Sequence, residues 1–83
     1  MKASNKVKIN CKTFSETISM TRNENGHWVV KMVRKYTELW IATRPDCDRE
    51  MELNCTLEKR EDAVKMCVYI AELDAKHAVL MSL

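Results

Sequence analysis

The stretch FSETISMTRNENGHWVVKMVRKY, residues 14–36, decides the fold of this chain of 83 residues. Phe14, Ile18 and Met20 share one phase of a two-residue period, which is typical of a strand with one covered face. An Asn-Gly pair, here Asn25-Gly26, is a strong hairpin signal when alternating apolar runs lie on both sides of it. Residues 14–36 therefore predict two antiparallel strands joined by a tight loop.

The length of this loop sets the register of the hairpin. A two-residue turn at Asn25-Gly26 would place Met20 opposite Lys31 and split the apolar side chains between both faces. A three-residue loop, with glycine in the left-handed position, keeps them on one face, and we adopt this register. The loop is Glu24-Asn25-Gly26, and the pairs are Met20 with Val30, Ile18 with Met32, Glu16 with Arg34 and Phe14 with Tyr36.

Toward the N-terminus, residues 6–12 alternate strictly between polar and apolar side chains, which predicts another strand whose wet face carries lysines. The apolar phase changes from odd to even numbers near Lys12-Thr13, so a bulge or a bend must redirect the chain there. Residues 6–22 are therefore one bent strand or two separate strands, and both alternatives stay open.

Toward the C-terminus, we expect a tight turn at Thr37-Glu38. This turn would pair Tyr36 with Leu39, so that the apolar face of the sheet continues on a further strand. After the loop that contains Pro45, residues 50–57 alternate again. They predict a last strand, and its wet face is acidic.

The rest of the chain predicts one long helix over about residues 57–80. Thr56 is a suitable N-cap, neither Gly nor Pro follows it, and acidic residues in the first turns favour the helix dipole. Projected at about 100° per residue, the helix has two apolar stripes on nearly opposite sides. The first suits close packing on a sheet and contains Leu57, Val64, Cys67, Val68, Ala71, Ala75 and Ala78. The second contains Met66, Tyr69, Ile70, Leu73, His77 and Leu80.

These elements predict an α+β fold, in which an antiparallel four- or five-stranded meander sheet is packed by one long C-terminal helix. The composition, 46% hydrophobic and 31% charged, lies in the range of a globular domain and outside that of disordered chains. A single Gly and a single Pro leave nothing that marks a linker. We therefore expect one domain, residues 1–83, with the strands within residues 6–56.

The sequence also argues against several classes of function. No run reaches the ~20 apolar residues of a spanning helix, and residues 1–10 lack the apolar core of a signal peptide, so we expect a cytoplasmic protein without membrane contact. The four cysteines lack the spacing of a zinc site, so we expect no metal and no cofactor. His27 and His77 accompany no nucleophile, phosphate-loop or H-E-x-x-H motif, so we do not expect an enzyme.

Charge is divided between the two halves of the chain. Residues 1–44 hold nine Lys/Arg and three Asp/Glu, a net charge of +6, whereas residues 45–83 hold five and nine, a net charge of −4. The expected sheet gathers a basic outer face with one tryptophan, on which bases could stack while the cations follow phosphates. The candidate binding residues are Lys6, Lys8, Lys31, Lys35, Trp40 and Arg44, with Trp40 opposite Lys35 and Arg44 opposite Lys31. The alternative is a solvated face on which Lys6 and Lys8 pair with Glu50 and Glu52. The candidate acidic surface is Asp46, Asp48, Glu50 and Glu52.

The second helix stripe has no evident cover within the chain. Its methionine, tyrosine, isoleucine and leucine side chains have the composition of an interface centre, and one helix that presents them favours two-fold pairing. A groove on a different protein could accept the same stripe. We expect a homodimer through the C-terminal helix, with Met66, Tyr69, Ile70, Leu73 and Leu80 in its interface.

The order of four strands and one helix resembles the single-stranded-DNA-binding domain of the PC4-like transcriptional coactivators. The likeness lies in Asn25-Gly26-His27-Trp28 at the hairpin and in the helix from Leu57 to Asp74, with Ala71-Glu72-Leu73-Asp74 near its end. The resemblance implies pairing through the helices and DNA bound on the sheet.

Two hypotheses follow. The first is a non-enzymatic inhibitor or adaptor, of the kind that small phage or mobile-element proteins provide, which docks on a host protein or nucleoprotein complex through charged surfaces. In this hypothesis the acidic surface mimics phosphates toward a basic channel, and electrostatic complementarity speeds association. The second is a PC4-like protein that binds single-stranded nucleic acid on the basic sheet face. The segregated charge favours the first hypothesis.

Overall fold

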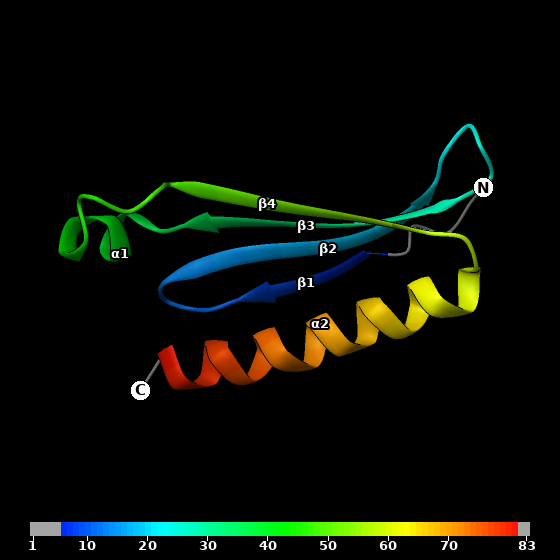
Figure 1. Ribbon diagram of the computed structural model, residues 1–83. Coiled ribbons are helices and arrows are strands. Elements are labelled where there is room, and N and C mark those ends of the chain that lie inside the picture. Colours follow the sequence, from blue (N-terminus) through cyan, green and yellow to red (C-terminus); the bar gives the residue numbers. More distant parts are fainter. Residues whose placement is uncertain (1–5, 82–83) are drawn as a thin grey trace.

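The computed structural model describes residues 6–81. Helix α2 lies along one face of a sheet, and the short helix α1 lies beyond one end of it (Figure 1). In chain order the elements are β1 (Lys6–Asn10), β2 (Phe14–Arg22), β3 (Trp28–Tyr36), α1 (Glu38–Thr43), β4 (Glu50–Leu57) and α2 (Arg60–Met81).

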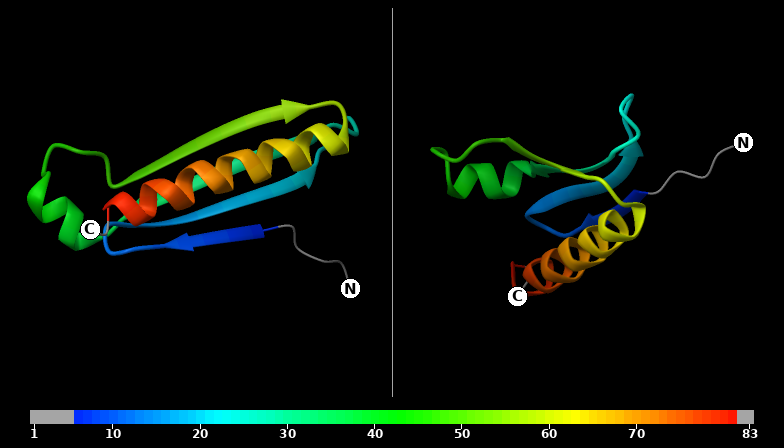
Figure 2. Two further views of the ribbon diagram at one scale, coloured as in Figure 1. Left: turned by 90° about the horizontal axis from the view of Figure 1, so that it is seen from below. Right: turned by 45° about the vertical axis from the view of Figure 1, so that its right-hand side comes forward.

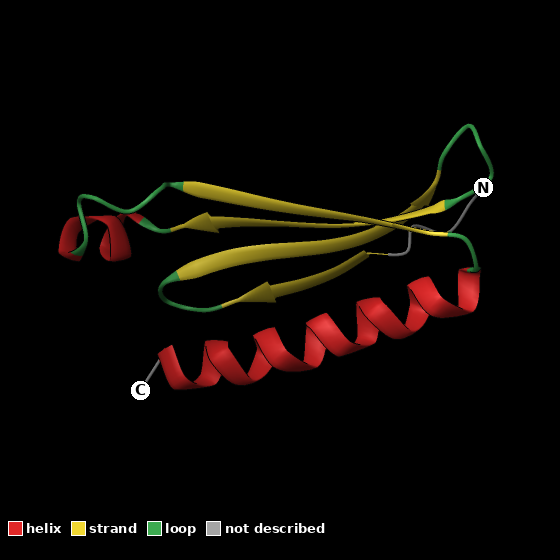
Figure 3. Cartoon of the chain, in the orientation of Figure 1, coloured by secondary structure: helices red, strands yellow, loops and turns green. Residues whose placement is uncertain are grey.

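The four strands form one antiparallel sheet in the order β1-β2-β3-β4, so each strand pairs with its neighbour in sequence. Figure 2 shows α2 running along the strands on one face of this sheet. In the part of the chain that the structure describes, the opposite face carries no helix (Figure 3). The predicted α+β fold, an antiparallel meander packed by one long C-terminal helix, is confirmed, with four strands.

The hairpin of β2 and β3 has the register that we predicted from its three-residue loop, and all four predicted pairs occur. Gly26 has a φ of 80°, a left-handed conformation that glycine adopts without strain. The side chain of Asn23 closes the loop, because its Oδ1 accepts hydrogen bonds from the N–H groups of Asn25 (3.0 Å) and His27 (2.9 Å). Local turn chemistry therefore sets the pairing of the two central strands.

Residues 6–22 form two strands, which settles the alternative that the sequence left open. In the turn between β1 and β2, the Cys11 N–H donates a hydrogen bond to the carbonyl oxygen of Phe14 (3.0 Å). This reversal places Val7 opposite Ile18 in the β1–β2 pair. The change of apolar phase in this region is thus a chain reversal and not a bulge.

The prediction of a strand directly after Thr37 is wrong, because Glu38–Thr43 is the helix α1. Thr37 is its N-cap, and the Thr37 hydroxyl accepts a hydrogen bond from the N–H of Trp40 (3.4 Å). Glu38 in the first turn also suits the helix dipole. These capping signals outweigh the short alternation of apolar residues that suggested a tight hairpin.

Strand β4 occupies the place beside β3 that the expected strand would have held. The N–H of Tyr36 donates to the carbonyl oxygen of Arg49 (2.9 Å), so the chain rejoins β3 directly before β4. β4 continues to Leu57, which lies opposite Trp28. Helix α2 therefore begins at Arg60, three residues later than we predicted from the N-cap at residue 56.

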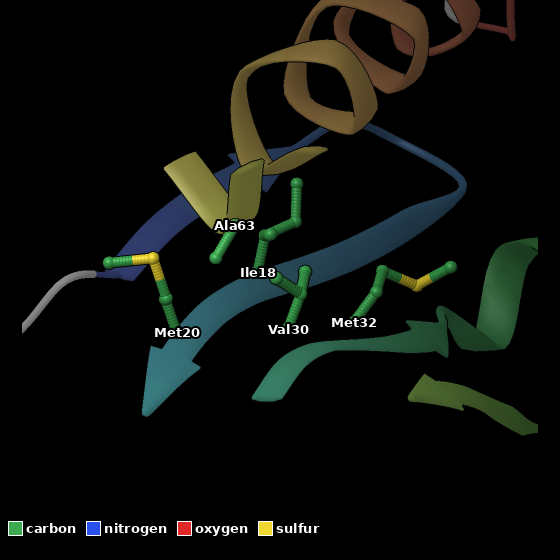
Figure 4. Packing of buried hydrophobic residues seen from close by; sticks show 5 residues of the cluster. All are labelled: Ile18, Met20, Val30, Met32 and Ala63. Carbon is green, nitrogen blue, oxygen red and sulfur yellow. The ribbon is translucent and has the colours of Figure 1, made fainter. Parts of the chain in front are cut away.

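The hydrophobic core lies between α2 and the central strands, and Ile18 and Val30 point toward the helix (Figure 4). Ala63 of α2 is fully buried against them, and its small side chain lets the helix approach the sheet closely. Met20 and Met32 complete the buried cluster. The partly buried residues packed against it are Ile9, Trp28, Leu57, Met66, Cys67, Ile70 and Ala71.

Helix α2 presents a different face to the sheet from the one that we predicted. Val64 and Val68, from the stripe assigned to the sheet, are 36% and 52% exposed. At about 100° per residue, the mean direction of the observed contact stripe is rotated by roughly 80° from that of the predicted one. This stripe contains Ala63, Met66, Cys67, Ile70, Ala71, Asp74 and Ala78. The prediction failed because the charged Asp74 was not counted as a residue that faces the sheet.

Candidate binding surfaces

One helix cannot cover the whole inner face of this sheet. Four strands spaced about 4.8 Å apart are wider than a helix of about 10 Å diameter. Apolar side chains consequently stay exposed on both sides of α2. Among the described residues, ten large hydrophobic side chains are exposed, whereas seven hydrophobic residues are buried. Because exposed large hydrophobic side chains outnumber the buried hydrophobic residues, part of the apolar surface is available to bind a partner.

The residues that we predicted for a dimer interface fall into two groups. Tyr69, Leu73 and Leu80 are 63%, 47% and 67% exposed, and we call these three residues the helix flank. Met66 and Ile70 are partly buried because they pack against the hydrophobic core. The structure therefore leaves only the helix flank open, and Met66 and Ile70 have contacts within their own chain.

On the other side of α2, an open hollow lies between the helix and the edge strand β1. Two adjoining cavities of about 370 and 350 Å³ share Val7, Cys67 and Val68 as lining residues. Burial raises the pKa of the Cys67 thiol, which disfavours its thiolate and a nucleophilic role. We call this hollow the apolar groove, and its apolar lining is Val7, Ile9, Ile18, Met20, Val64, Cys67, Val68, Ala71 and Ala75.

The outer face of the sheet carries its charges in bands that follow the strands. Lys6 and Lys8 lie on β1, and Lys31 and Lys35 lie on β3, with the hydroxyl side chains of β2 between them. Glu52 of β4 approaches Lys31, with 3.7 Å between Oε2 and Nζ, and both side chains are about half exposed. A solvated pair of this kind contributes little stability. The face is thus basic at its β1 edge and acidic at its β4 edge.

Trp40 and Arg44 do not lie on this outer face, because the chain is helical from residue 38 to 43. The Trp40 ring stacks on Tyr36, with 5.9 Å between centroids and 21° between planes. The Arg44 guanidinium lies 4.7 Å from the centroid of the same ring. The predicted positions of Trp40 and Arg44 opposite sheet lysines are wrong, and the expected platform of a tryptophan among lysines does not form.

The four acidic candidates are neighbours in the structure as in the sequence. Asp46 and Asp48 are exposed in the loop between α1 and β4, and Glu50 and Glu52 are exposed on β4. β4 is an edge strand of the sheet. These carboxylates therefore give one edge of the molecule a negative surface that a partner can approach.

A buried ionic cluster, which the sequence indicated only in part, fastens α2 to the sheet. Arg34 Nε lies 2.6 Å from Glu16 Oε1, and Arg34 Nη2 lies 3.5 Å from Asp74 Oδ1. Glu16 is 1% exposed and Arg34 is 8% exposed. The guanidinium also donates to the Tyr36 hydroxyl (3.4 Å) and lies 4.1 Å from the ring centroid of Phe14. The hairpin register predicted the pair of Glu16 and Arg34, but no sequence signal indicated Asp74.

A shared proton explains how two carboxyl groups fit beside one arginine. Burial and the hydrogen bond with Asp74 raise the pKa of Glu16 from 4.5 to about 7. Glu16 Oε2 and Asp74 Oδ2 are buried without another polar partner among the described residues. A proton on Glu16 lets its carboxyl group donate to Asp74 and leaves one negative charge beside one positive charge. Because Glu16 and Arg34 are buried, we assign the cluster a structural role.

Comparison with protein families, with curated proteins and with solved structures gave no match to this chain. Neither helix within residues 6–81 combines the length and the apolar character of a membrane-spanning segment. In the same residues, no three His, Cys, Asp or Glu side chains gather closely enough to hold a metal ion. A function for this chain therefore has to be inferred from its exposed surfaces.

Proposed function

We propose that this chain is a non-enzymatic binding protein that forms a homodimer through α2 and docks on a partner protein as an inhibitor or adaptor. The helix flank carries the proposal. Tyr69, Leu73 and Leu80 are bulky apolar side chains, and each is at least 47% exposed in a chain with a small core. Exposed apolar residues of this size, grouped on one element, are typical of interaction sites.

The spacing of the helix flank favours a second helix as its cover. Leu73 follows Tyr69 by four residues and Leu80 follows Leu73 by seven, so the three side chains form one stripe along α2. The flank runs from Tyr69 to Leu80 of this 22-residue helix and therefore spans about three turns. A stripe on one helix is self-complementary about a two-fold axis, because each residue can meet its counterpart in an antiparallel pair.

Charged surfaces remain open for the partner protein when α2 is paired. The acidic residues Asp46, Asp48, Glu50 and Glu52 lie along the β4 edge, away from the basic β1 edge. Such an edge suits a basic surface on the target, including one that normally holds nucleic acid, because complementary charges speed association. This charge pattern supports docking through the sheet edge.

Binding of single-stranded nucleic acid is the second candidate function. Lys6, Lys8, Lys31 and Lys35 point from one face of the sheet, and this observation favours contact with phosphates. The absence of Trp40 from this face removes the stacking contact that we predicted. A labelled oligonucleotide that does not bind at about 50 mM salt would eliminate this candidate, since phosphate contacts are strongest at low salt.

The dimer is tested by Leu73→Glu, with Val79→Glu as the matched control. Val79 is 63% exposed on the same helix and, at about 100° per residue, points away from the helix flank. We expect light scattering at low protein concentration, where contacts between sheet edges are dissociated, to give a dimer mass for the parent chain and for Val79→Glu, and a monomer mass for Leu73→Glu. Ile70 is unsuitable as a test site because it packs against the core. At that low concentration, a monomeric parent chain or a dimeric Leu73→Glu contradicts the proposed interface.

Docking is tested by reversing the charge of the acidic edge with Asp46→Lys and Glu50→Lys together. The parent chain and a variant with the exposed Glu24→Lys change serve as controls, since Glu24 lies in the loop between β2 and β3. We expect a partner that the parent retains from a native lysate to be lost by the edge variant and kept by the loop variant. A partner retained equally by all three proteins rules out docking through this edge.

A further inference from the structure

The two edge strands of the sheet are complementary to each other. β1 and β4 are the outermost strands, and each presents an unpaired ladder of N–H and C=O groups among the described residues. The outer face of β1 carries Lys6 and Lys8, whereas the outer face of β4 carries Glu50 and Glu52. One edge is therefore basic and the other acidic, on the same face of the sheet.

The inner faces of these two strands are also matched. Val7 of β1 is 42% exposed, and Met51 and Leu53 of β4 are 36% and 56% exposed. These residues alternate with the charged ones on both strands, because side chains along a strand point to opposite faces in turn. Each edge is thus charged outside and apolar inside.

The direction of the strands allows one copy of the chain to extend the sheet of another. In an antiparallel meander of four strands, β1 and β4 run in opposite directions. A second copy that is placed beside the first without being turned over therefore presents its β4 antiparallel to β1. Its helix α2 then lies on the same side of the joint sheet, and the charged faces of both copies coincide.

One register pairs opposite charges on the outer face and apolar side chains on the inner face. When Lys8 lies opposite Glu52 of the second copy, all five residues of β1 lie opposite residues of β4. The apolar pairs are Val7 with Leu53 and Ile9 with Met51, and Lys6 is the diagonal neighbour of Glu52. In the single chain, Lys31 approaches the same carboxylate at 3.7 Å, so Glu52 would lie between two lysines.

Pairing of like edges is disfavoured by the same charges. Two β1 strands in antiparallel contact about Lys8 would place this lysine opposite its own copy. Two β4 strands in contact about Met51 would place Glu50 opposite Glu52. Lysines and other charges on edge strands commonly prevent sheet extension. Here the charges prevent pairing of like edges and leave the unlike pair as the favourable one.

The apolar groove supplies room for the side chains of the incoming strand. It lies between β1 and α2 and is lined by Val7, Ile9 and Val68, with Lys6 and Arg60 near one end. A strand added to β1 runs about 4.8 Å away from it, so its inner side chains reach the mouth of this groove. Met51 and Leu53 of the second copy are suited to that place.

From these observations we propose that the chain assembles head to tail, with β4 of one copy added to β1 of the next and with Met51 and Leu53 against the apolar groove. A repeated contact between unlike edges produces a ring or an open filament. The proposal goes beyond the helix-paired dimer and uses none of the residues of the helix flank. The two contacts can therefore be tested separately. The edge contact does use Glu50 and Glu52 of the edge proposed for docking, so one β4 strand either joins another copy or meets the partner protein.

The test reverses the charge of each edge in a chain that carries Leu73→Glu, so that pairing through α2 is absent. One variant adds Lys6→Glu with Lys8→Glu, a second adds Glu50→Lys with Glu52→Lys, and a third adds all four changes. All four positions are exposed, so circular dichroism should report unchanged folding. Light scattering over a range of concentrations measures the average mass.

We expect the Leu73→Glu chain to grow beyond the monomer as its concentration rises. Each two-residue reversal should weaken association by tenfold or more, on the order expected for turning two cross-strand attractions into repulsions. The variant with all four changes should associate like the Leu73→Glu chain. An equal mixture of the two singly reversed variants should also associate, because the acidic edges of one then meet the basic edges of the other.

Three results would overturn head-to-tail assembly. If the Leu73→Glu chain stays monomeric up to about 1 mM, β4 and β1 of different copies do not associate. If the two variants with one reversed edge associate as strongly as the Leu73→Glu chain, the edge charges do not contribute to association. Failure of both the four-residue variant and the mixture to recover association shows that the charges do not meet across a joint. Failure of the α2 dimer appears separately, as equal masses of the parent and Leu73→Glu chains.

Discussion

Replacing Glu16 by glutamine tests whether the buried cluster holds a proton on Glu16. In the structure, the Glu16 carboxyl group accepts a hydrogen bond from Arg34 and, when protonated, donates one to Asp74. A glutamine side chain can make both hydrogen bonds, because its oxygen accepts and its amide group donates. Glu16→Gln is therefore a permanent mimic of the protonated cluster, and it removes only the ability to ionise.

The pH dependence follows from the direction of the pKa shift. Burial raises the pKa of Glu16 from 4.5 to about 7 in the folded chain, so the stability from this group is complete below pH 4.5. It declines as the pH rises and is lost once the pH exceeds about 7. A shift of this size corresponds to about 3 kcal/mol. We expect Glu16→Gln to match the parent chain near pH 4 and to be more stable by about 3 kcal/mol near pH 8.

Urea denaturation between pH 4 and pH 9, followed by tryptophan fluorescence, measures this difference. In thermal unfolding it should appear as a rise of roughly 10 °C or more at pH 8 for a domain of this size. Glu24→Gln, at an exposed loop position, is the control and should follow the parent chain at every pH. If Glu16→Gln is equally stable or less stable than the parent at pH 8, the carboxyl group is not held protonated by the fold.

Three further changes test the packing and the hairpin. Phe14→Ala should destabilise the chain by about 3 to 5 kcal/mol in urea denaturation because Phe14 is fully buried, whereas Leu39→Ala, at an exposed position, should change little. Ala63→Leu should cost about 1 to 3 kcal/mol and lower the melting temperature, since there is no room between α2 and the core. Gly26→Ala should lower the unfolding free energy by about 1 kcal/mol, because its φ of 80° is unfavourable for alanine although only the flexible Arg22 side chain is near. A neutral result at either of the last two positions would contradict the helix-to-sheet distance or the loop conformation.

The central hairpin could be predicted from sequence because its information is local. An Asn-Gly loop and a two-residue apolar period lie within residues 14–36, and only one loop length keeps the apolar side chains together. The same reasoning failed for the residues after Thr37, where a short alternation competed with the capping signals of α1. A short segment carries too few residues for its period to decide between a strand and a helix.

The candidate surfaces were predictable to different degrees. Lys31 and Lys35 were placed correctly on the outer face because their positions depend only on the parity of a predicted strand. Trp40 and Arg44 were misplaced because their positions depended on the wrong element. The separation of Lys6 and Glu50 to opposite edges depends on strand order, which no local pattern contains.

The sequence by itself determined the strands, the loop that sets their central register and the existence of a long C-terminal helix, since each depends on neighbouring residues. Only the tertiary structure decided which face of α2 meets the sheet. That choice involves Asp74, a charged residue that lies against the sheet because Arg34 and Glu16, whose pKa is raised by burial, are there to receive it. An ion pair between distant segments leaves no trace in a hydrophobic period, and so the rotation of the helix could not be read from the chain alone.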